Sequence, residues 1–198
     1  NVGNPVRSEI LLKPTLQPII KEDFNILILG GSQGSKQLNK IVLKSFEGRI
    51  VPSNWNIVHQ IGDLDRNSVV DAYSKQSFNY EVVPYIEDID KAYHNSDLVV
   101  ARSGAMTISE ICCSSNPSIL FPLPWAADNH QYFNAKFLED RQASILLESS
   151  LDSADSLFML LNDLEKDHNA RHSMGLNAFN AFPIYSGNKI VEIINESF

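Results

Sequence analysis

Residues 25–35 read NILILGGSQGS, a short apolar run that passes directly into a glycine-rich turn. Such a run, bounded by turn residues, is typical of a buried strand. The amphipathic stretch Ser35 to Phe46 that follows predicts a helix, and Ser32 or Ser35 is placed to cap it. A strand, a glycine turn and a helix in this order indicate an α/β fold with a parallel sheet.

The same alternation of short apolar and longer amphipathic runs continues along the chain. It predicts strands at Asn25 to Gly30, Asn56 to Ile61, Tyr80 to Tyr85, Asp97 to Arg102, Ser118 to Leu123 and Ser144 to Glu148. It predicts helices at Ser35 to Phe46, Asp65 to Lys75, Ile89 to His94, Ala105 to Cys113, Asn129 to Asp140, Asp152 to Lys166, Asn169 to Ala181 and Asn188 to Ser197. The fold class expected is α/β, a Rossmann-like, doubly wound parallel sheet.

Composition limits the kinds of partner. The 198 residues carry 16 Lys and Arg against 24 Asp and Glu, a net charge of −8. This balance argues against an extended nucleic-acid surface and against strong attraction to anionic lipid. The only cysteines, Cys112 and Cys113, are adjacent, which favours a reducing, cytoplasmic setting and a packing role in a helix. No apolar stretch approaches the roughly 18 residues of a spanning helix.

The N-terminal segment differs from the rest. Residues 1–22 contain Pro5, Pro14 and Pro18, and the chain starts with turn residues and no Met. We expect residues 1–22 to be an interdomain linker and lead-in, cut from a longer polypeptide, and residues 23–198 to form one domain.

Two strand-to-helix turns are candidate anion sites. In parallel α/β sheets, ligands sit beyond the carboxyl ends of the strands, where the N-H groups of helix starts point outward. Glycines in a turn let an anion approach the backbone closely. The first turn contains Gly30, Gly31 and Gly34, and the second contains Ser103 and Gly104. Two cradles at one sheet edge suit a diphosphate, although an ordinary capped glycine turn is the alternative for the first.

The helix expected after the second turn carries a carboxylate. If it starts near Ala105, then Ala105, Ile108 and Cys112 form an apolar stripe, and Thr107 and Glu110 share another face. A carboxylate facing the crevice is suited to accept two hydrogen bonds from a ribose diol. A solvated helix glutamate is the alternative.

A third candidate stretch, residues 128–134, reads DNHQYFN. Asp128 is expected to cap the helix, and the amides of Gln131 and Asn134 share one face, where they suit sugar hydroxyls. Residues 83–88, VPYIED, end a strand in a loop whose backbone is able to read a planar base edge. An ordinary strand end is the alternative for that loop.

No metal or cofactor site is expected. The D-x-D patterns at residues 63–65 and 88–90 precede helical stretches, so their aspartates are interpreted as caps. His168 and His172 have helical spacing without a further ligand set, so we expect exposed helix residues. His59 and His94 show no special context.

Taken together, residues 3–7 (GNPVR), 30–34 (GGSQG), 102–105 (RSGA, followed by Thr107, Ser109 and Glu110) and 128–134 resemble the MurG family of GT-B glycosyltransferases. The motifs match the donor-binding C-terminal half of those enzymes, in order and over nearly the whole chain. The resemblance implies that UDP-N-acetylglucosamine is the donor. The positions that match the family's donor-binding residues are Arg7, Ser32, Ile86, Ala105, Met106, Thr107, Ile108, Ser109, Glu110 and Gln131.

The resemblance also implies individual roles. Ser32 and its turn would meet the diphosphate, the Ile86 backbone the uracil, and Glu110 the ribose. Gln131 with Asn134 would meet the sugar hydroxyls. Helix N-termini would replace a metal as the counter-charge to UDP.

The family's N-terminal half is expected to carry the rest of the activity. It would hold the lipid I acceptor, the catalytic base and the membrane contact, so this chain alone would be inactive. The full-length enzyme would make lipid II for peptidoglycan synthesis, as a peripheral protein on the cytoplasmic face of the bacterial inner membrane.

Two alternatives remain open. The chain is also compatible with a separate nucleotide-sugar-binding subunit of a split glycosyltransferase. Residues 30–34 further match the G-x-S-x-G elbow of α/β-hydrolases, with Ser32 as nucleophile. Against the elbow, no HGGG-like segment precedes it, and a hydrolase leaves the turn at Ser103 unexplained.

Overall fold

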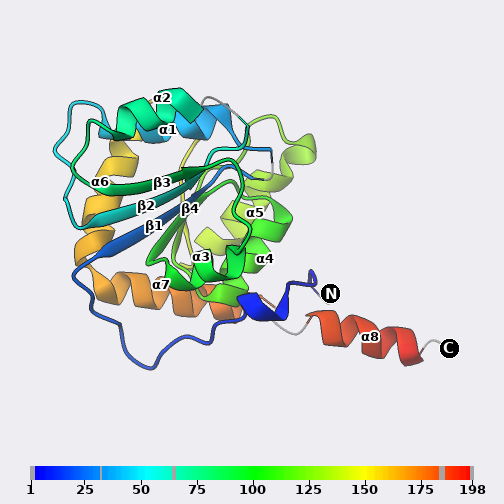
Figure 1. The fold of residues 1–198 in the computed structure, drawn as a ribbon. Helices are drawn as coiled ribbons and strands as arrows, with labels where there is room; N and C mark the ends of the chain where they lie inside the picture. The colour runs from blue at the N-terminus through cyan, green and yellow to red at the C-terminus, as the bar shows by residue number, and fades with distance from the viewer. Residues whose placement is uncertain (1–2, 32, 64–65, 183–185, 197–198) are drawn as a thin grey trace.

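The fold is an open parallel sheet with helices on both faces (Figure 1). The computed structural model describes residues 3–31, 33–63, 66–182 and 186–196. The strands are β1 (Phe24–Leu29), β2 (Trp55–Gln60), β3 (Asn79–Val83), β4 (Leu98–Ala101), β5 (Ser118–Leu120) and β6 (Ile145–Leu146). They form a six-stranded sheet in the order β3-β2-β1-β4-β5-β6, with every neighbouring pair parallel. The predicted doubly wound α/β class is confirmed.

The helices follow the predicted order with shifts of a few residues at their ends. They are α1 (Lys36–Phe46), α2 (Arg66–Tyr73), α3 (Ile89–Asn95), α4 (Ala105–Ser114), α5 (His130–Glu139), α6 (Ser153–Lys166), α7 (His168–Ala181) and α8 (Ser186–Glu196). Two short 3-10 turns, η1 (Ser8–Ile10) and η2 (Ala127–Asn129), were not predicted. Single turns of this kind are too short to give a periodic signal.

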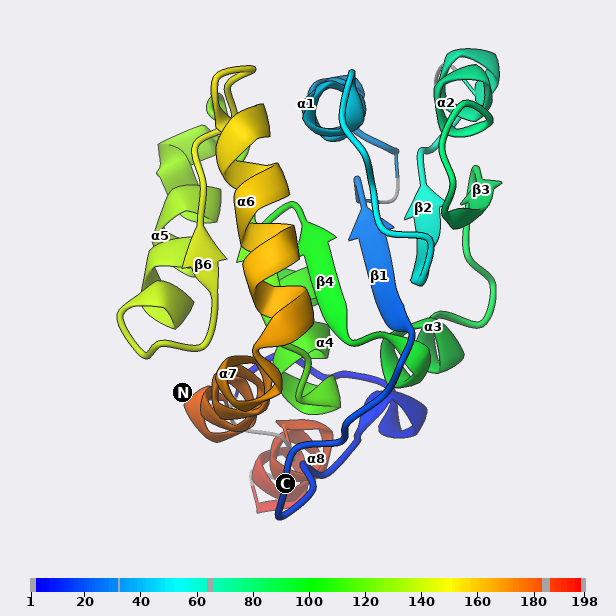
Figure 2. The same ribbon diagram turned by 90° about the vertical axis from the view of Figure 1, so that its left-hand side faces the viewer.

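Two apolar cores explain why the strands are nearly continuous apolar runs. In β1, Ile26 and Ile28 belong to the core beneath α1, α2 and α6, whereas Leu27 and Leu29 belong to the core beneath α3, α4 and α5. Successive side chains of a strand point to opposite faces, so a strand covered on both faces needs apolar residues at every position. In Figure 2, α6 crosses in front of the sheet beside α1, and α7 turns beneath it.

The lead-in lies along the domain. Ile10 is buried in the second core, and Asn4 Nδ2 donates to Ser109 Oγ at 3.1 Å. The backbone N-H of Leu12 donates to Cys113 O at 2.9 Å. Residues 4–12 are therefore placed along α4, while the boundary at residue 22 stays a prediction.

The C-terminal helix α8 extends away from the body of the domain (Figure 1). Its Val191, Ile193 and Ile194 are exposed. None of the helices in the described ranges is long and apolar enough to cross a membrane.

Local details correct several predictions. Ala105 is exposed, and the apolar stripe of α4 is formed by Ile108, Ile111 and Cys112. Asp128 is not the N-cap of α5, because the cap position is Asn129 and both residues adopt left-handed φ angles, 51° and 53°. The packing role predicted for the two adjacent cysteines is confirmed, since both are buried and unpaired.

Candidate functional site

One cleft collects most of the predicted site residues at the carboxyl ends of the strands. It has a volume of about 660 Å³, within the range of small-molecule sites. It opens where β1 and β4 lie side by side, the point at which the strand order reverses direction. The predicted residues that line it are Arg7, Gly30, Gly31, Gly34, Ile86, Gly104, Ala105, Met106, Thr107, Glu110 and Gln131.

Other predicted residues lie elsewhere. Ile108 and Ser109 are buried because α4 turns this face toward the core, and Ser103 is buried in the turn before α4. Asn134 lines a smaller neighbouring cavity together with Asn4 and the side of α4. Ser32 lies outside the described residues.

The first turn is held by close backbone packing. Gly34 has a φ of +73°, and a Cβ there would lie 2.1 Å from Ile61 O. Its N-H donates to Gly31 O at 3.0 Å. Ser35 then caps α1, since its Oγ accepts from Leu38 N at 3.2 Å. The turn thus places the N-terminus of α1 against the cleft, where its partial positive charge faces any bound anion.

Arg102 is a buried cation behind that helix end. It is 5% exposed and lines the cleft wall at the end of β4. Its Nε and Nη2 donate to Ser35 Oγ at 3.0 and 2.8 Å, and its Nη1 donates to Phe121 O at 2.9 Å. Gln37 and Ser149 also accept from it.

All of these acceptors are neutral. Within the described ranges, no carboxylate pairs with Arg102. Burial lowers the pKa of the guanidinium to about 10, so it remains charged at neutral pH. A cation without a counter-charge therefore lies beside the anion-facing end of α1, a feature that the sequence reading missed.

The second turn is supported by side chains. Ser103 Oγ donates to Gln131 O at 2.8 Å, and Asn134 Nδ2 donates to Ser103 O at 3.0 Å. The side chain of Gln131 accepts from Leu123 N at 3.0 Å through Oε1. The Asn134 amide therefore ties α5 to the turn before α4, whereas the Gln131 amide ties α5 to the loop after β5. The first helical hydrogen bond of α4 runs from Ile108 N to Gly104 O, so the N-H groups of the three preceding residues, all of which line the cleft, have no partner within the helix.

Glu110 stands at the far wall of the cleft. It is half-buried, and its Oε2 accepts from the hydroxyl of Tyr93 at 3.0 Å. Burial raises the pKa of Glu110, while the Tyr93 hydrogen bond and the nearby Arg7 charge act in the opposite direction. Tyr93 was not singled out from the sequence, because it lies 17 positions away and reads there as an ordinary helix residue.

Gln60 links the two loops that enclose the cleft. Its Nε2 donates to Gly31 O at 3.0 Å, and its Oε1 accepts from Ile86 N at 3.1 Å. The only sequence signal for it is a polar side chain at the end of a buried strand. This bond occupies the backbone N-H group of Ile86. The family resemblance implied that the same backbone meets the uracil.

The prediction that His59 has no special context is wrong. His59 is 0% exposed, with Nδ1 2.8 Å from the Tyr73 hydroxyl and Nε2 3.2 Å from Asn39 Oδ1. Because an amide oxygen only accepts, Nε2 carries the proton and Nδ1 accepts from Tyr73. Asn39 Nδ2 donates in turn to Ile61 O at 3.4 Å, the same oxygen that packs on Gly34. The network supports the first turn from within the core.

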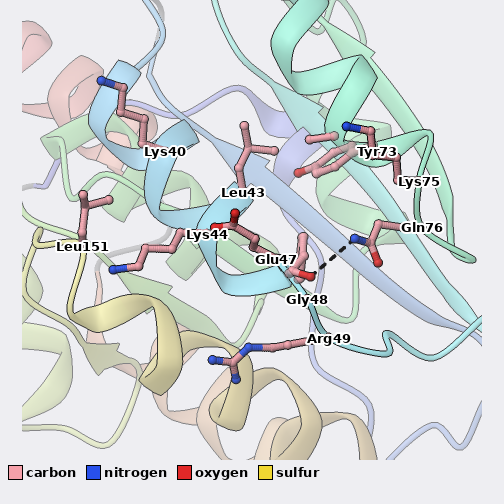
Figure 3. A pocket seen from close by; sticks show the side chains of 12 residues that line it. Lys40, Leu43, Lys44, Glu47, Gly48, Arg49, Tyr73, Lys75, Gln76 and Leu151 are labelled. Carbon is pink, nitrogen blue, oxygen red and sulfur yellow. Dashed lines mark hydrogen bonds between the residues drawn. The ribbon is translucent and has the colours of Figure 1, made fainter.

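A second hollow of similar volume lies at the opposite end of α1 (Figure 3). It is lined by Lys40, Lys44, Arg49 and Lys75 around the apolar Leu43 and Leu151. It contains the C-terminal ends of α1 and α2, where helix carbonyls point outward and disfavour anions. Neither glycine-containing turn reaches it, so it does not share the chemistry of the cleft.

The predictions on metals were tested only in part. Within the described ranges, no three His, Cys, Asp or Glu side chains gather to hold a metal. Asp88 is at the N-cap position of α3 but makes no capping bond, and it pairs with Lys91 at 2.5 Å. Of the other D-x-D stretch, residues 64 and 65 lie outside the described ranges.

The expectation that His168 and His172 are exposed is wrong, because both are half-buried. His168 bonds to the Arg171 side chain, and His172 bonds to Thr15 O.

Known proteins share both the sequence pattern and this architecture. The family model described as "Glycosyltransferase family 28 C-terminal domain" matches residues 25–190. A UDP-N-acetylglucosamine--N-acetylmuramyl-(pentapeptide) pyrophosphoryl-undecaprenol N-acetylglucosamine transferase of Desulfotalea psychrophila is 32% identical over 98% of this chain and 53% of its own length. The enzyme of the same name from Azotobacter vinelandii is 38% identical over 82% of this chain and 46% of its own length.

A solved structure agrees with these relatives. The crystal structure of MurG from Acinetobacter baumannii superposes with a TM-score of 0.79 and 30% identity, covering 90% of this chain and 51% of that one. The chain thus spans about half the length of the curated relatives it matches. With these matches the hydrolase alternative has no support. The chain belongs to the glycosyltransferase family 28 C-terminal domains, and the resemblance to the MurG family seen in its motifs is confirmed.

Proposed function

We propose that the chain is the donor-binding half of an inverting transferase that moves N-acetylglucosamine from UDP-N-acetylglucosamine to lipid I. One observation carries the proposal: two strand-to-helix turns and a buried arginine, which has no carboxylate partner among the described residues, converge on one cleft. The names of the two related transferases supply the donor and acceptor classes.

The diphosphate would lie between the two helix starts. The partial positive charge of α1 and α4 and the charge of Arg102 would balance it without a metal. The N-H groups of Ala105, Met106 and Thr107, which start α4, would donate to its oxygens. We keep Ser32 in this role as a proposal from the family pattern.

The nucleoside and the sugar would occupy the two sides of the cleft. Glu110 would accept from the ribose diol, with Arg7 beside it. The loop at Ile86 would meet the uracil, which requires its N-H to exchange Gln60 for the base. Gln131 would reach the sugar with its Nε2, which donates to no described residue.

The predicted residues outside the cleft would act indirectly. Ile108 and Ser109 would hold α4 and the lead-in in place, because their side chains are buried. Asn134 would fix the backbone of the second turn through Ser103.

The relatives extend well beyond the half that this chain matches. We propose that the catalytic base, the lipid I site and the membrane contact lie in the unmatched part, and that the whole enzyme is peripheral on the cytoplasmic face of the inner membrane. A separate acceptor-binding subunit would meet the same need.

Binding measurements on two variants test the donor site. Titration calorimetry with UDP and UDP-N-acetylglucosamine should show binding that persists in EDTA. Glu110→Ala should weaken both ligands by about tenfold to a hundredfold, the loss of a hydrogen bond to a charged group. Gln131→Ala should weaken only the nucleotide sugar, because its partners lie on the sugar.

Matched controls come from the far hollow of Figure 3. Glu47→Ala removes a carboxylate and Gln76→Ala removes a side-chain amide there. Both variants should leave the affinities for UDP and UDP-N-acetylglucosamine unchanged. Absence of binding by the wild-type chain, or equal UDP affinity in wild type and folded Glu110→Ala, would refute the proposed donor site.

A further inference from the structure

Tyr93 is a fully buried tyrosine whose hydroxyl ends at the candidate site. It is 0% exposed, and its ring packs in the core beneath α3, α4 and α5. Burial, together with the adjacent Glu110 carboxylate, holds the pKa of Tyr93 well above its ordinary value. The hydroxyl therefore keeps its proton and acts as a donor to Glu110 Oε2.

Glu110 lies between this tyrosine and the cleft. The cleft is lined by Glu110 but not by Tyr93. One carboxylate oxygen is held by Tyr93, whereas Oε1 accepts from no residue in the described part of the chain. A glutamate with a free side chain loses rotamer freedom when it binds a ligand, and a prior hydrogen bond removes much of that loss.

Tyr93 is itself fixed by its backbone. Its carbonyl oxygen accepts from Asn116 Nδ2 at 3.1 Å and from Ser96 N at 3.2 Å. α3, which carries Tyr93, begins at Ile89, just after the loop that contains Ile86. The same short helix thus connects the proposed base-binding loop to the carboxylate.

We propose that Tyr93 is a positioning residue that orients the Glu110 carboxylate for the vicinal diol of a nucleotide ligand. The inference rests on the proposed function, because the ribose of that ligand supplies the diol. Tyr93 acts through Glu110 and does not touch the ligand.

Removal of one hydroxyl from the protein and of the diol from the ligand tests the inference. Tyr93→Phe keeps the buried ring, and its fold is checked by circular dichroism and thermal melting. The affinity for UDP should fall about tenfold, as expected for loss of a hydrogen bond that supports a charged group. The affinity for 2′,3′-dideoxy-UDP should not change, because this ligand offers Glu110 no hydroxyl.

Two comparisons separate positioning from a general structural effect. Tyr73→Phe removes an equally buried hydroxyl that bonds to His59 in the other core, so it should alter the two affinities by the same factor. In a Glu110→Ala background, Tyr93→Phe should cause no further loss of UDP affinity, because the group that it positions is gone.

The outcomes distinguish the two proposals. Wild type that binds neither ligand contradicts the donor-site proposal. Wild type that prefers UDP over the dideoxy ligand supports that proposal, and the role of Tyr93 is then overturned if Tyr93→Phe keeps the same preference. The role of Tyr93 is also overturned if Tyr93→Phe lowers the affinities for UDP and for the dideoxy ligand by the same factor. It is overturned as well if Tyr93→Phe lowers UDP affinity as much in the Glu110→Ala background as in the wild type.

Discussion

The turn after β1 and the turn after β4 serve the same cleft but are built in different ways. In the first, Gly34 packs with its backbone against Ile61 and adopts a positive φ. In the second, Gly104 has an ordinary φ of −63°, and a Cβ there would approach nothing closer than Thr107 Oγ1 at 3.9 Å. Ser103 and Asn134 hold this second turn by side-chain bonds.

The difference separates two reasons for a glycine. At Gly34 the fold itself requires a residue without a side chain, because the turns after β1 and β2 are in contact there. At Gly104 neither the backbone angle nor a neighbouring atom excludes a side chain, and the residue lines the cleft. Substitutions at the two turns should therefore separate stability from binding.

The largest effect is expected for Gly34→Ala. The new Cβ would lie 2.1 Å from Ile61 O, and the φ of +73° disfavours any side chain. Either the two turns separate or the variant fails to fold, so the free energy of unfolding should fall by about 3 kcal/mol or more. Urea denaturation measures it, and a loss below about 1 kcal/mol would show that the contact yields easily.

The support beneath the first turn should make stability depend on pH. Burial holds the pKa of His59 at about 3 in the folded chain, against 6.5 when it is exposed. Because the pKa of His59 is lower in the folded chain than in the unfolded chain, neutral His59 contributes its full amount to the free energy of unfolding above pH 6.5. This contribution declines as the pH falls from 6.5 toward 3. At pH 4.5 the loss should be about 2 to 3 kcal/mol relative to pH 7.5.

His59→Gln is the comparison variant, because it has no imidazole to protonate. It should be less stable at pH 7.5, and its stability should decline less steeply between pH 6.5 and 4.5 in urea denaturation series. Parallel curves for the two proteins would contradict a buried neutral histidine. The carboxylates contribute equally to both curves.

The smallest effect on stability is expected for Gly104→Ala. The methyl group fits the space, and the only cost is a less favourable N-cap residue, about 1 kcal/mol at most. UDP affinity should nevertheless fall about tenfold, because the methyl group would occupy the place where the proposed diphosphate site meets α4. Unchanged UDP affinity in the folded variant would remove the second turn from the donor site.

Much of the fold was predictable because its signals are local. The two-residue alternation of strands, the helical period and the glycine turns are each read within a short window. The strands at 24–29 and 98–101 and the helices that follow them were found for this reason. Short turns such as η1, and the left-handed residues before α5, were missed because a few residues carry no period.

The candidate site was predictable only as a set of positions. The motifs brought Gly31, Gly104 and Glu110 to one sheet edge, because parallel strands end at the same edge. They did not show which partner each side chain has. Asn134 turns to Ser103, and Ile108 and Ser109 face the core, because the side-chain directions depend on how α4 and α5 pack.

The sequence by itself therefore determined the element order, the parallel sheet, the two turns at its edge and the family. The tertiary structure alone decided that Arg102 is buried among neutral acceptors, that His59 is buried and hydrogen-bonded, and that Tyr93 holds Glu110. The physical reason is the range of each interaction. Helix and strand preferences act between near neighbours in the chain, whereas these pairings join residues on different elements and exist only once the sheet order has set the distances between them.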